Sequence, residues 1–249
     1  MENAMSKTFL IDTTRCTACR GCQLACKEWY ELPANKTFQT GTHQNPPDLN
    51  PNNYKLVRFS EHLIGDKVEW YFFPDQCRHC LNPPCQGAAD TLIEGAVIQD
   101  EATGAVIFTE KSAKFSKDDF EYVRESCPYN IPRRDEKSGR MVKCVMCIDR
   151  VQAGMVPACV KVCPTGTMNF GERDEMLALA EKRLAKVRET HPDAMLADPY
   201  DVNVIYLLGD KPERYHEHSV ASVTPMNRKN LFATVRSAVG NVKDAVRKG

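Results

Sequence analysis

Four cysteines fall within a short segment near the start of the chain, in the stretch CTACRGCQLAC. Cys16, Cys19, Cys22 and Cys26 are separated by two, two and three residues. A lone cysteine is best explained by packing, but this C-x2-C-x2-C-x3-C run has the spacing that ligates cubane iron–sulfur clusters. The first three thiols suit one cluster, and the fourth suits a neighbouring cluster. The run therefore predicts a second cysteine motif elsewhere in the chain.

The partner motif lies far along the chain, in CVMC and CVKVCP, which supply Cys144, Cys147, Cys159 and Cys163. In two-cluster ferredoxins the last cysteine of each motif ligates the other cluster. This crossed pattern assigns Cys16, Cys19, Cys22 and Cys163 to one 4Fe-4S cluster (cluster 1). It assigns Cys26, Cys144, Cys147 and Cys159 to a second 4Fe-4S cluster (cluster 2).

The remaining cysteines suffice for one further 4Fe-4S cluster (cluster 3), ligated by Cys77, Cys80, Cys85 and Cys127. A fourth cluster with crossed ligands would need four more cysteines, at positions that hold Ala89, Lys117, Phe120 and Val123. The segment 116–126 begins with a capping-box pattern, Ser116 and Asp119, and therefore predicts a short helix. We expect this helix to fill the space of the missing cluster with the side chains of Phe120 and Val123.

Zinc is an alternative for the Cys-x2-Cys pairs, and His79 offers a nitrogen ligand. Zinc does not explain the four-thiol run, whereas three clusters use all twelve cysteines. A disulfide framework is disfavoured because two-residue spacings suit structural bridges poorly. We expect His79 to be a neighbour of cluster 3 and not a ligand.

The segments around the cysteines predict short strands and hairpins. Residues 8–12 read as a strand that delivers the first cysteine loop, and residues 32–53 read as a long irregular loop rich in Pro and Asn. Residues 54–60 and 68–73 alternate as two strands, and residues 96–110 form a hairpin with its turn at EATG.

Beyond the last cysteine the pattern becomes helical. Residues 173–191 place Met176, Leu177, Ala180, Leu184 and Val187 on one face of an amphipathic helix. Residues 202–208 follow as a strand. Residues 227–249 read as a basic amphipathic helix, which suits either docking to a partner or membrane surface, or folding back onto the chain.

These elements favour an α+β fold built from ferredoxin-like iron–sulfur domains, in two pseudo-repeated units of which one has lost a cluster. Short β-hairpins and a C-terminal helical extension complete it. The first unit comprises residues 5–31 and 140–171 with clusters 1 and 2. The second comprises residues 54–139 with cluster 3. Residues 172–249 add a helix, a strand and the amphipathic tail.

Composition excludes several classes of protein. The chain has 249 residues, and its 33 Lys and Arg balance its 33 Asp and Glu, so nothing indicates nucleic-acid binding. No apolar stretch approaches the roughly 18 residues of a membrane span, and the first residues lack the pattern of a secretory signal. There is no Gly-rich nucleotide loop, Ser/His/Asp set or paired-carboxylate arrangement. We therefore expect a non-catalytic electron carrier.

Cations near the cysteines are candidates for stabilising the reduced clusters, because each cluster with four thiolates carries net negative charge. They are Arg15, Arg20, Arg78, Lys143, Arg150 and Lys161.

The motifs CTACRGCQLAC, CRHCLNPPC, CPYNIP and CVMC with CVKVCPTG resemble those of the iron–sulfur (beta) electron-transfer subunits of molybdenum or tungsten bis-pterin oxidoreductases. That family commonly holds four cubane clusters in two ferredoxin-like pairs, and this sequence departs from it by lacking the ligands of one. Within the family, the resemblance is to the three-cluster beta subunit of formate dehydrogenases from sulfate-reducing bacteria.

The resemblance implies a catalytic alpha subunit that oxidises formate or reduces CO2 at a tungsten or molybdenum bis-pterin, with a further 4Fe-4S cluster of its own. It also implies an acceptor such as a multihaem cytochrome c, and a heterodimer that is periplasmic because the alpha subunit carries the export signal. A cytoplasmic location is the alternative. Cysteine spacing is equally compatible with a thiosulfate, polysulfide or sulfoxide reductase, with a hydrogenase-like complex, or with a zinc-binding scaffold.

Overall fold

A mixed sheet of four strands lies at the centre of the protein, for which a computed structural model describes residues 6–221. The strand order is β8 (Met168–Glu172), β1 (Lys7–Asp12), β10 (Val204–Leu208) and β9 (Met195–Ala197). Strand β1 runs parallel to β10 and antiparallel to β8, and β9 runs antiparallel to β10. Every residue of β10 is buried, as expected for a central strand covered on both faces.

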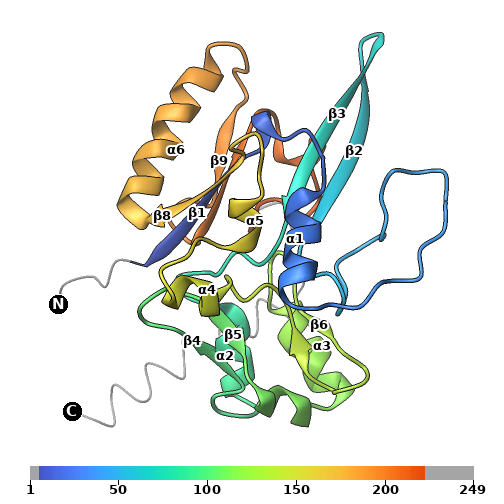
Figure 1. The fold of residues 1–249 in the computed structure, drawn as a ribbon, viewed down its shortest axis with the longest axis vertical. Helices are drawn as coiled ribbons and strands as arrows, with labels where there is room; N and C mark the ends of the chain where they lie inside the picture. Colours follow the sequence, from blue (N-terminus) through green and yellow to red (C-terminus); the bar gives the residue numbers. More distant parts are fainter. Residues whose placement is uncertain (1–5, 222–249) are drawn as a thin grey trace.

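The two faces of this sheet have different coverings. Helix α6 (Arg173–Arg188) packs on one face, where Leu10 and Ile205 share an apolar cluster with Ala180 of the helix. On the other face, Phe9 and Tyr206 share a cluster that includes cysteines. Figure 1 shows α6 and the cysteine-bearing helices on opposite sides of the sheet. The predictions of a strand at 8–12, a helix beginning at 173 and a strand at 202–208 are confirmed.

The sheet joins segments that the sequence assigned to different regions. Strand β10 belongs to the predicted C-terminal extension, yet it pairs directly with β1 of the predicted first unit. The first unit and the extension therefore share one hydrogen-bonded sheet and one core. The division of the chain into three regions stays a prediction.

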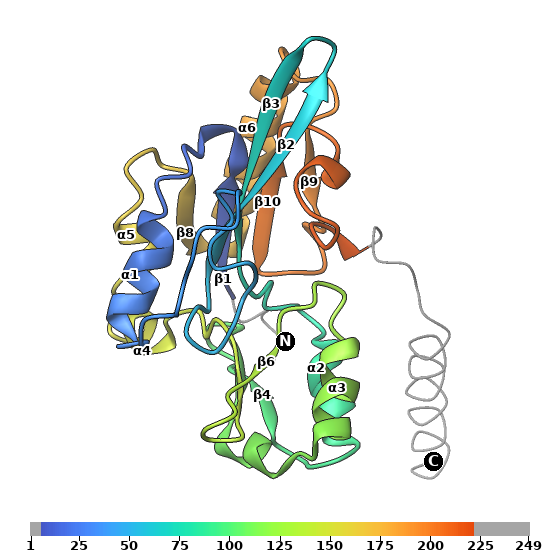
Figure 2. The same ribbon diagram turned by 90° about the vertical axis from the view of Figure 1, so that its right-hand side faces the viewer.

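The cysteine-bearing side of the sheet carries three short helices, α1 (Gly21–Trp29), α4 (Ile148–Gln152) and α5 (Ala158–Lys161). Beside them a long hairpin of β2 (Leu56–Ile64) and β3 (Lys67–Asp75) projects from the body, as Figure 2 shows. The predicted strands at 54–60 and 68–73 are thus confirmed, and each is longer than expected. The long loop before β2 is irregular, as predicted.

The remaining elements lie together at the other end of the molecule, below the sheet in both views. They are helices α2 (Pro84–Asp90) and α3 (Lys117–Glu125), the hairpin of β4 (Val97–Gln99) and β5 (Val106–Phe108), and the hairpin of β6 (Arg133–Arg134) and β7 (Met141–Val142). Short 3-10 turns occur at Thr13–Arg15, Glu110–Lys114 and Pro212–Arg214. The predicted hairpin at 96–110 is confirmed.

Helix α3 begins as predicted. The Ser116 side chain accepts a hydrogen bond from the Asp119 backbone, and the Asp119 carboxylate accepts one from the Ser116 backbone. Phe120 and Val123 are buried in the same apolar cluster as Ala89 of helix α2. Three of the four positions that would carry the ligands of a fourth cluster thus meet in one apolar core. Packed apolar side chains therefore fill the space in which the ligands of a fourth cluster would otherwise lie.

The sequence also predicts a C-terminal amphipathic helix and no membrane span. The predicted amphipathic helix at 227–249 lies outside the described residues. Among residues 6–221, none of the helices has the length and apolar character needed to span a bilayer.

Candidate metal centres

Three of the four Cys-x2-Cys loops share one backbone conformation, the exception being Cys19–Cys22. In each of the three, the residue just before the second cysteine is left-handed: Ala18, His79 and Met146 have φ angles of 53°, 46° and 61°. A left-handed residue other than glycine is costly, and such residues concentrate at functional sites. These three loops, from distant parts of the chain, are therefore bent in the same way.

The bend turns a backbone N–H toward the first cysteine of each loop. The His79 N–H donates to Cys77 Sγ at 3.4 Å. Burial raises the pKa of Cys16 to about 11, and a backbone hydrogen bond from Ala18 opposes that rise. Burial likewise raises the pKa of Cys144 to about 12, and the backbone of Met146 opposes it. Each loop thus offers a hydrogen-bond donor to a thiolate sulfur, which suits a cluster ligand.

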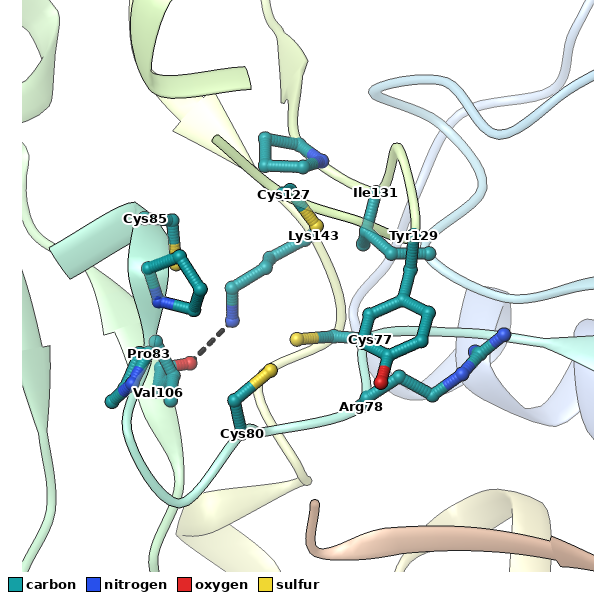
Figure 3. Close-up of a pocket in the computed structure, with 12 residues that line it drawn as sticks. Cys77, Arg78, Cys80, Pro83, Cys85, Val106, Cys127, Tyr129, Ile131 and Lys143 are labelled. Atoms are coloured by element: carbon teal, nitrogen blue, oxygen red, sulfur yellow. Dashed lines mark hydrogen bonds between the residues drawn. The ribbon is translucent and has the colours of Figure 1, made fainter. Parts of the chain in front are cut away.

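The four cysteines predicted for cluster 3 surround one cavity. Cys77 and Cys80 follow strand β3, Cys85 lies on helix α2, and Cys127 follows helix α3. Figure 3 shows their sulfur atoms converging from separate segments on one cavity. The rest of the wall is mostly apolar, with two cations: Arg78, Pro83, Pro84, Val106, Tyr129, Ile131, Pro132 and Lys143. The donor set and the apolar lining fit a 4Fe-4S cluster.

The other two groups of thiols are recognisable by their mutual electrostatic effects. Burial raises the pKa of Cys26, and Cys144, Cys159 and Cys147 raise it further. Burial also raises the pKa of Cys22; Lys55 lowers it, while Cys163 and Cys19 raise it. The structure therefore brings Cys26 to the second motif and Cys163 to the first. Ligation of clusters 1 and 2 by these groups stays a prediction.

The same effects reveal which groups are neighbours. The pKa of Cys159, in the cluster 2 group, is raised by burial and, among other thiols, by Cys22 of the cluster 1 group. The pKa of Cys144, also in the cluster 2 group, is raised by burial and by Cys77 of the cluster 3 group. The cluster 2 thiols therefore lie near thiols of both other groups.

The thiols in each group are spread more widely than the ligands of a single ion. Within the described part of the chain, no three Cys, His, Asp or Glu side chains come close enough together to hold one metal ion. Tetrahedral zinc, with zinc–sulfur bonds of about 2.3 Å, requires such a compact group.

Comparisons with known proteins agree with this geometry. A family model described as a 4Fe-4S dicluster domain matches residues 68–173. A formate dehydrogenase 2 subunit beta (cytochrome c-553) of Nitratidesulfovibrio vulgaris is 64% identical over 216 residues, which is 86% of this chain and 99% of that protein. The formate dehydrogenase subunit beta of Megalodesulfovibrio gigas is 54% identical over 217 residues, covering 87% of this chain and 100% of that protein.

This chain belongs to the formate dehydrogenase beta subunits. A more distant relative, the nitrate-inducible formate dehydrogenase iron–sulfur subunit of Escherichia coli, is 39% identical over 213 residues, covering 83% of this chain and 70% of the relative. The family resemblance of the cysteine motifs is confirmed, as is the ferredoxin-like α+β class.

The cations of the beta subunit differ in burial from one another. Of the six cations that sequence placed near the cysteines, Arg78 and Lys143 are buried, whereas Arg15 and Lys161 are exposed. Arg20 and Arg150 are partly exposed and stack on the rings of Phe59 and Trp29, at 4.7 and 4.2 Å.

Arg78 is held by a polar and aromatic cage. It pairs with Asp75 at 3.0 Å, and its guanidinium lies 4.4 Å from the centre of the Tyr206 ring and 4.9 Å from that of Tyr129. Its positive charge is therefore matched by a buried carboxylate beside the cluster 3 cavity.

His79 is completely buried beside the cluster 3 thiols. Its Nδ1 accepts a hydrogen bond from the Val106 N–H at 3.0 Å, so the proton of the neutral ring belongs on Nε2. Burial lowers the pKa of His79 well below its usual value, and Lys143 lowers it further. The ring of the beta subunit therefore stays neutral and acts as a packed neighbour of the site.

Sequence reasoning missed Lys55. This residue precedes strand β2 and is almost fully buried. Burial lowers the pKa of Lys55, but the thiolates of Cys22 and Cys159 raise it more, so the net pKa lies above its usual value. In the sequence, Lys55 stands in a predicted strand far from any cysteine, and only the folded beta subunit brings it to the thiols.

Proposed function

We propose that this beta subunit relays single electrons through three 4Fe-4S clusters, between the catalytic subunit of a formate dehydrogenase and an external acceptor, and that it catalyses no reaction itself. The observation that carries the proposal is the arrangement of the twelve thiols. Four thiols line the cluster 3 cavity, and the mutual electrostatic effects of the other eight support two further groups, with the cluster 2 thiols near both of the others. A linear order of clusters is what an electron relay needs.

The residues of the chain would hold each cluster and keep water from it. The twelve cysteines would supply the ligands: Cys16, Cys19, Cys22 and Cys163 for cluster 1; Cys26, Cys144, Cys147 and Cys159 for cluster 2; Cys77, Cys80, Cys85 and Cys127 for cluster 3. When bound, each cluster accepts and donates one electron. Left-handed loop residues present N–H groups to the sulfurs, and apolar walls such as Ile131 and Pro132 exclude solvent.

The proposed partner is a catalytic alpha subunit that oxidises formate or reduces CO2. It would carry a tungsten or molybdenum bis-pterin and a further 4Fe-4S cluster. Membership of the formate dehydrogenase beta subunits supports this partner, because a beta subunit works within an enzyme complex. Near cluster 1, the exposed Cys19 offers a short path for electrons between the relay and a docked protein.

The proposed acceptor is a cytochrome c, for which the sequence resemblance implies a multihaem protein. The name of the N. vulgaris relative includes cytochrome c-553, which supports an acceptor of this class. We further propose a heterodimer in the periplasm, exported together with the alpha subunit, with the cytoplasm as the alternative location.

Purification of the native complex tests this function. We expect about twelve irons and as many acid-labile sulfides from this chain, because three cubanes contain twelve of each. Formate should reduce added cytochrome c through the complex, and the catalytic subunit without this chain should still reduce a small dye but not the cytochrome. A chain that copurifies with zinc and no sulfide would contradict the proposal, as would a catalytic partner with no formate activity.

A further inference from the structure

Buried arginines and buried lysines of this protein differ in their partners. Arg78 pairs with the buried Asp75, which also binds the half-buried Arg58, and Arg133 pairs with Asp48. Lys55 and Lys143 are equally buried, yet within residues 6–221 neither forms an ion pair with a carboxylate. Their charge must be balanced by something other than Asp or Glu.

The direct contacts of these two ammonium groups are neutral. Lys55 Nζ donates to the Pro74 carbonyl at 3.3 Å and to the side-chain oxygen of Gln76. Lys143 Nζ donates to the carbonyl oxygens of Val106 and Cys144, the latter at 3.0 Å. Carbonyl dipoles satisfy the N–H groups but do not neutralise a buried charge, which is unfavourable without an opposite charge nearby.

Lys55 lies between the thiols of clusters 1 and 2. The start of strand β2 is tied to helix α1, because the Val57 N–H donates to the side chain of Gln23, next to Cys22, at 3.2 Å. Val57, Cys22 and Cys159 belong to one apolar cluster. Lys55 stands two residues before Val57, a spacing that places side chains on the same side of an extended chain. It therefore lies near a ligand of each group.

Lys143 lies between the thiols of clusters 2 and 3. In the chain it directly precedes Cys144, and its ammonium is hydrogen-bonded to the carbonyl of that residue. Its side chain also forms part of the wall of the cluster 3 cavity, with the nitrogen directed toward the carbonyl oxygen of Val106 (Figure 3). One buried lysine thus stands in each gap between neighbouring groups.

We propose that Lys55 and Lys143 are the counter-charges of the electron relay, one in each gap, and that each raises the reduction potential of both clusters beside it. Reduction adds negative charge, and a positive charge in a low-dielectric interior stabilises that state. The two lysines would not ligate the clusters and would act on them only through their positive charge. This inference rests on the proposed function, since it requires three clusters in a line.

The arrangement predicts a specific pattern of effects. Cluster 1 borders only the gap of Lys55, cluster 3 borders only that of Lys143, and cluster 2 borders both. Arg78 also lies beside cluster 3, but Asp75 balances its charge. Removing one lysine should therefore lower two potentials, and the two single variants should have exactly one affected cluster in common.

The test is a redox titration followed by EPR, on the complete complex with its catalytic subunit. Lys55→Met and Lys143→Met should each make reduction of the two adjacent clusters at least tenfold less favourable, which is about 59 mV for a one-electron couple. Potentials of the catalytic subunit serve as internal references. Unchanged potentials in both variants, or the same two clusters shifted by both, would overturn the proposal.

Two controls separate charge from packing. Lys55→Arg and Lys143→Arg keep the positive charge, so the reduction potentials of the adjacent clusters should stay close to those of the wild type. Lys161→Met removes an exposed lysine between Cys159 and Cys163 and should shift potentials far less, because solvent screens its charge. Arginine variants as strongly shifted as the methionine variants would show a packing effect and overturn the counter-charge role.

Iron and sulfide analysis of each preparation keeps the two proposals distinguishable. A wild-type chain without three clusters defeats the proposed function, whatever the lysines do. If the wild-type chain holds three clusters and neither methionine variant changes their reduction potentials, only the counter-charge role is contradicted. If a methionine variant fails to assemble clusters, the Arg variant decides: assembly with Arg supports the need for positive charge, and failure with Arg contradicts it.

Discussion

At the scale of single residues, the crossed ligand pattern makes Cys163 a partner of the first motif despite its distance along the chain. We expect Cys163→Ser and Cys19→Ser to remove the same EPR signal, because both thiols are assigned to cluster 1. Cys159→Ser should remove a different signal, that of cluster 2. If Cys163→Ser instead matched Cys159→Ser, each motif would bind its own cluster and the crossed pattern would be wrong.

Asp75 is a buried carboxylate that two guanidinium groups share. Its carboxylate accepts hydrogen bonds from Arg58 at 2.7 Å and from Arg78 at 3.0 Å. Asp75→Asn leaves the buried Arg78 without a carboxylate partner, whereas Arg58 keeps Asp48 at 2.6 Å. Because a buried cation then lacks its counter-charge, we expect a loss of about 3–5 kcal/mol in the free energy of unfolding. Chemical denaturation of the loaded protein measures it. A loss below about 1 kcal/mol would show that the buried pairs contribute little.

The same carboxylate makes stability depend on pH. Burial acts to raise the pKa of Asp75, but Arg78 and Arg58 hold it below its usual value. Because the folded-state pKa is depressed, the stabilisation is present above the unfolded pKa of about 3.9 and is lost as the pH falls toward the folded pKa. The difference in unfolding free energy between wild type and Asp75→Asn should therefore shrink below about pH 4. A difference that stayed constant there would contradict this assignment.

At the scale of elements, helix α3 depends on its capping box. Ser116→Ala removes the oxygen that accepts the Asp119 N–H, and we expect a loss of about 1 kcal/mol in unfolding free energy. Ser116→Thr keeps an acceptor at this position and should lose much less. Equal losses in the two variants would mean that the hydroxyl does not cap the helix.

The hairpin of β4 and β5 depends on a glycine at its turn. Gly104 has a φ of +74°, and a Cβ there would lie 2.5 Å from the amide nitrogen of Asn203, near the start of β10. Gly104→Ala should cost roughly 1–3 kcal/mol from backbone strain, plus a further penalty for the clash. Gly154 has a φ of +73° but open space around it, so Gly154→Ala serves as the matched control. Thermal unfolding should show the larger loss for Gly104→Ala.

At the scale of the whole molecule, cluster ligands tie segments that are far apart in the chain. The thiols around the cluster 3 cavity come from a loop after β3, from α2 and from the end of α3. Because metal binding also orders the ligands, we expect removal of iron by an oxidant and chelator to lower the unfolding temperature markedly and to weaken native circular dichroism. Reconstitution with iron and sulfide should restore both. An unchanged unfolding temperature would show that the protein core alone maintains the fold.

Regular spacing along the chain was enough to recognise several features. The twelve thiols, the capping box of α3, the alternating residues of β2 and β3, and the apolar face of α6 all follow from residues close to one another in sequence. Propensity, capping and periodicity act over such short distances, so these elements needed no knowledge of their neighbours.

Contacts between distant segments account for what spacing could not reveal. The pairing of β10 with β1 and the burial of Lys55 both depend on residues that are remote in the chain. Lys55 looks like an ordinary strand lysine until α1, β2 and the second cysteine motif come together around it. Burial and the charges that surround a residue are properties of the assembled core, and this is why the tertiary structure was needed to find a counter-charge between the clusters.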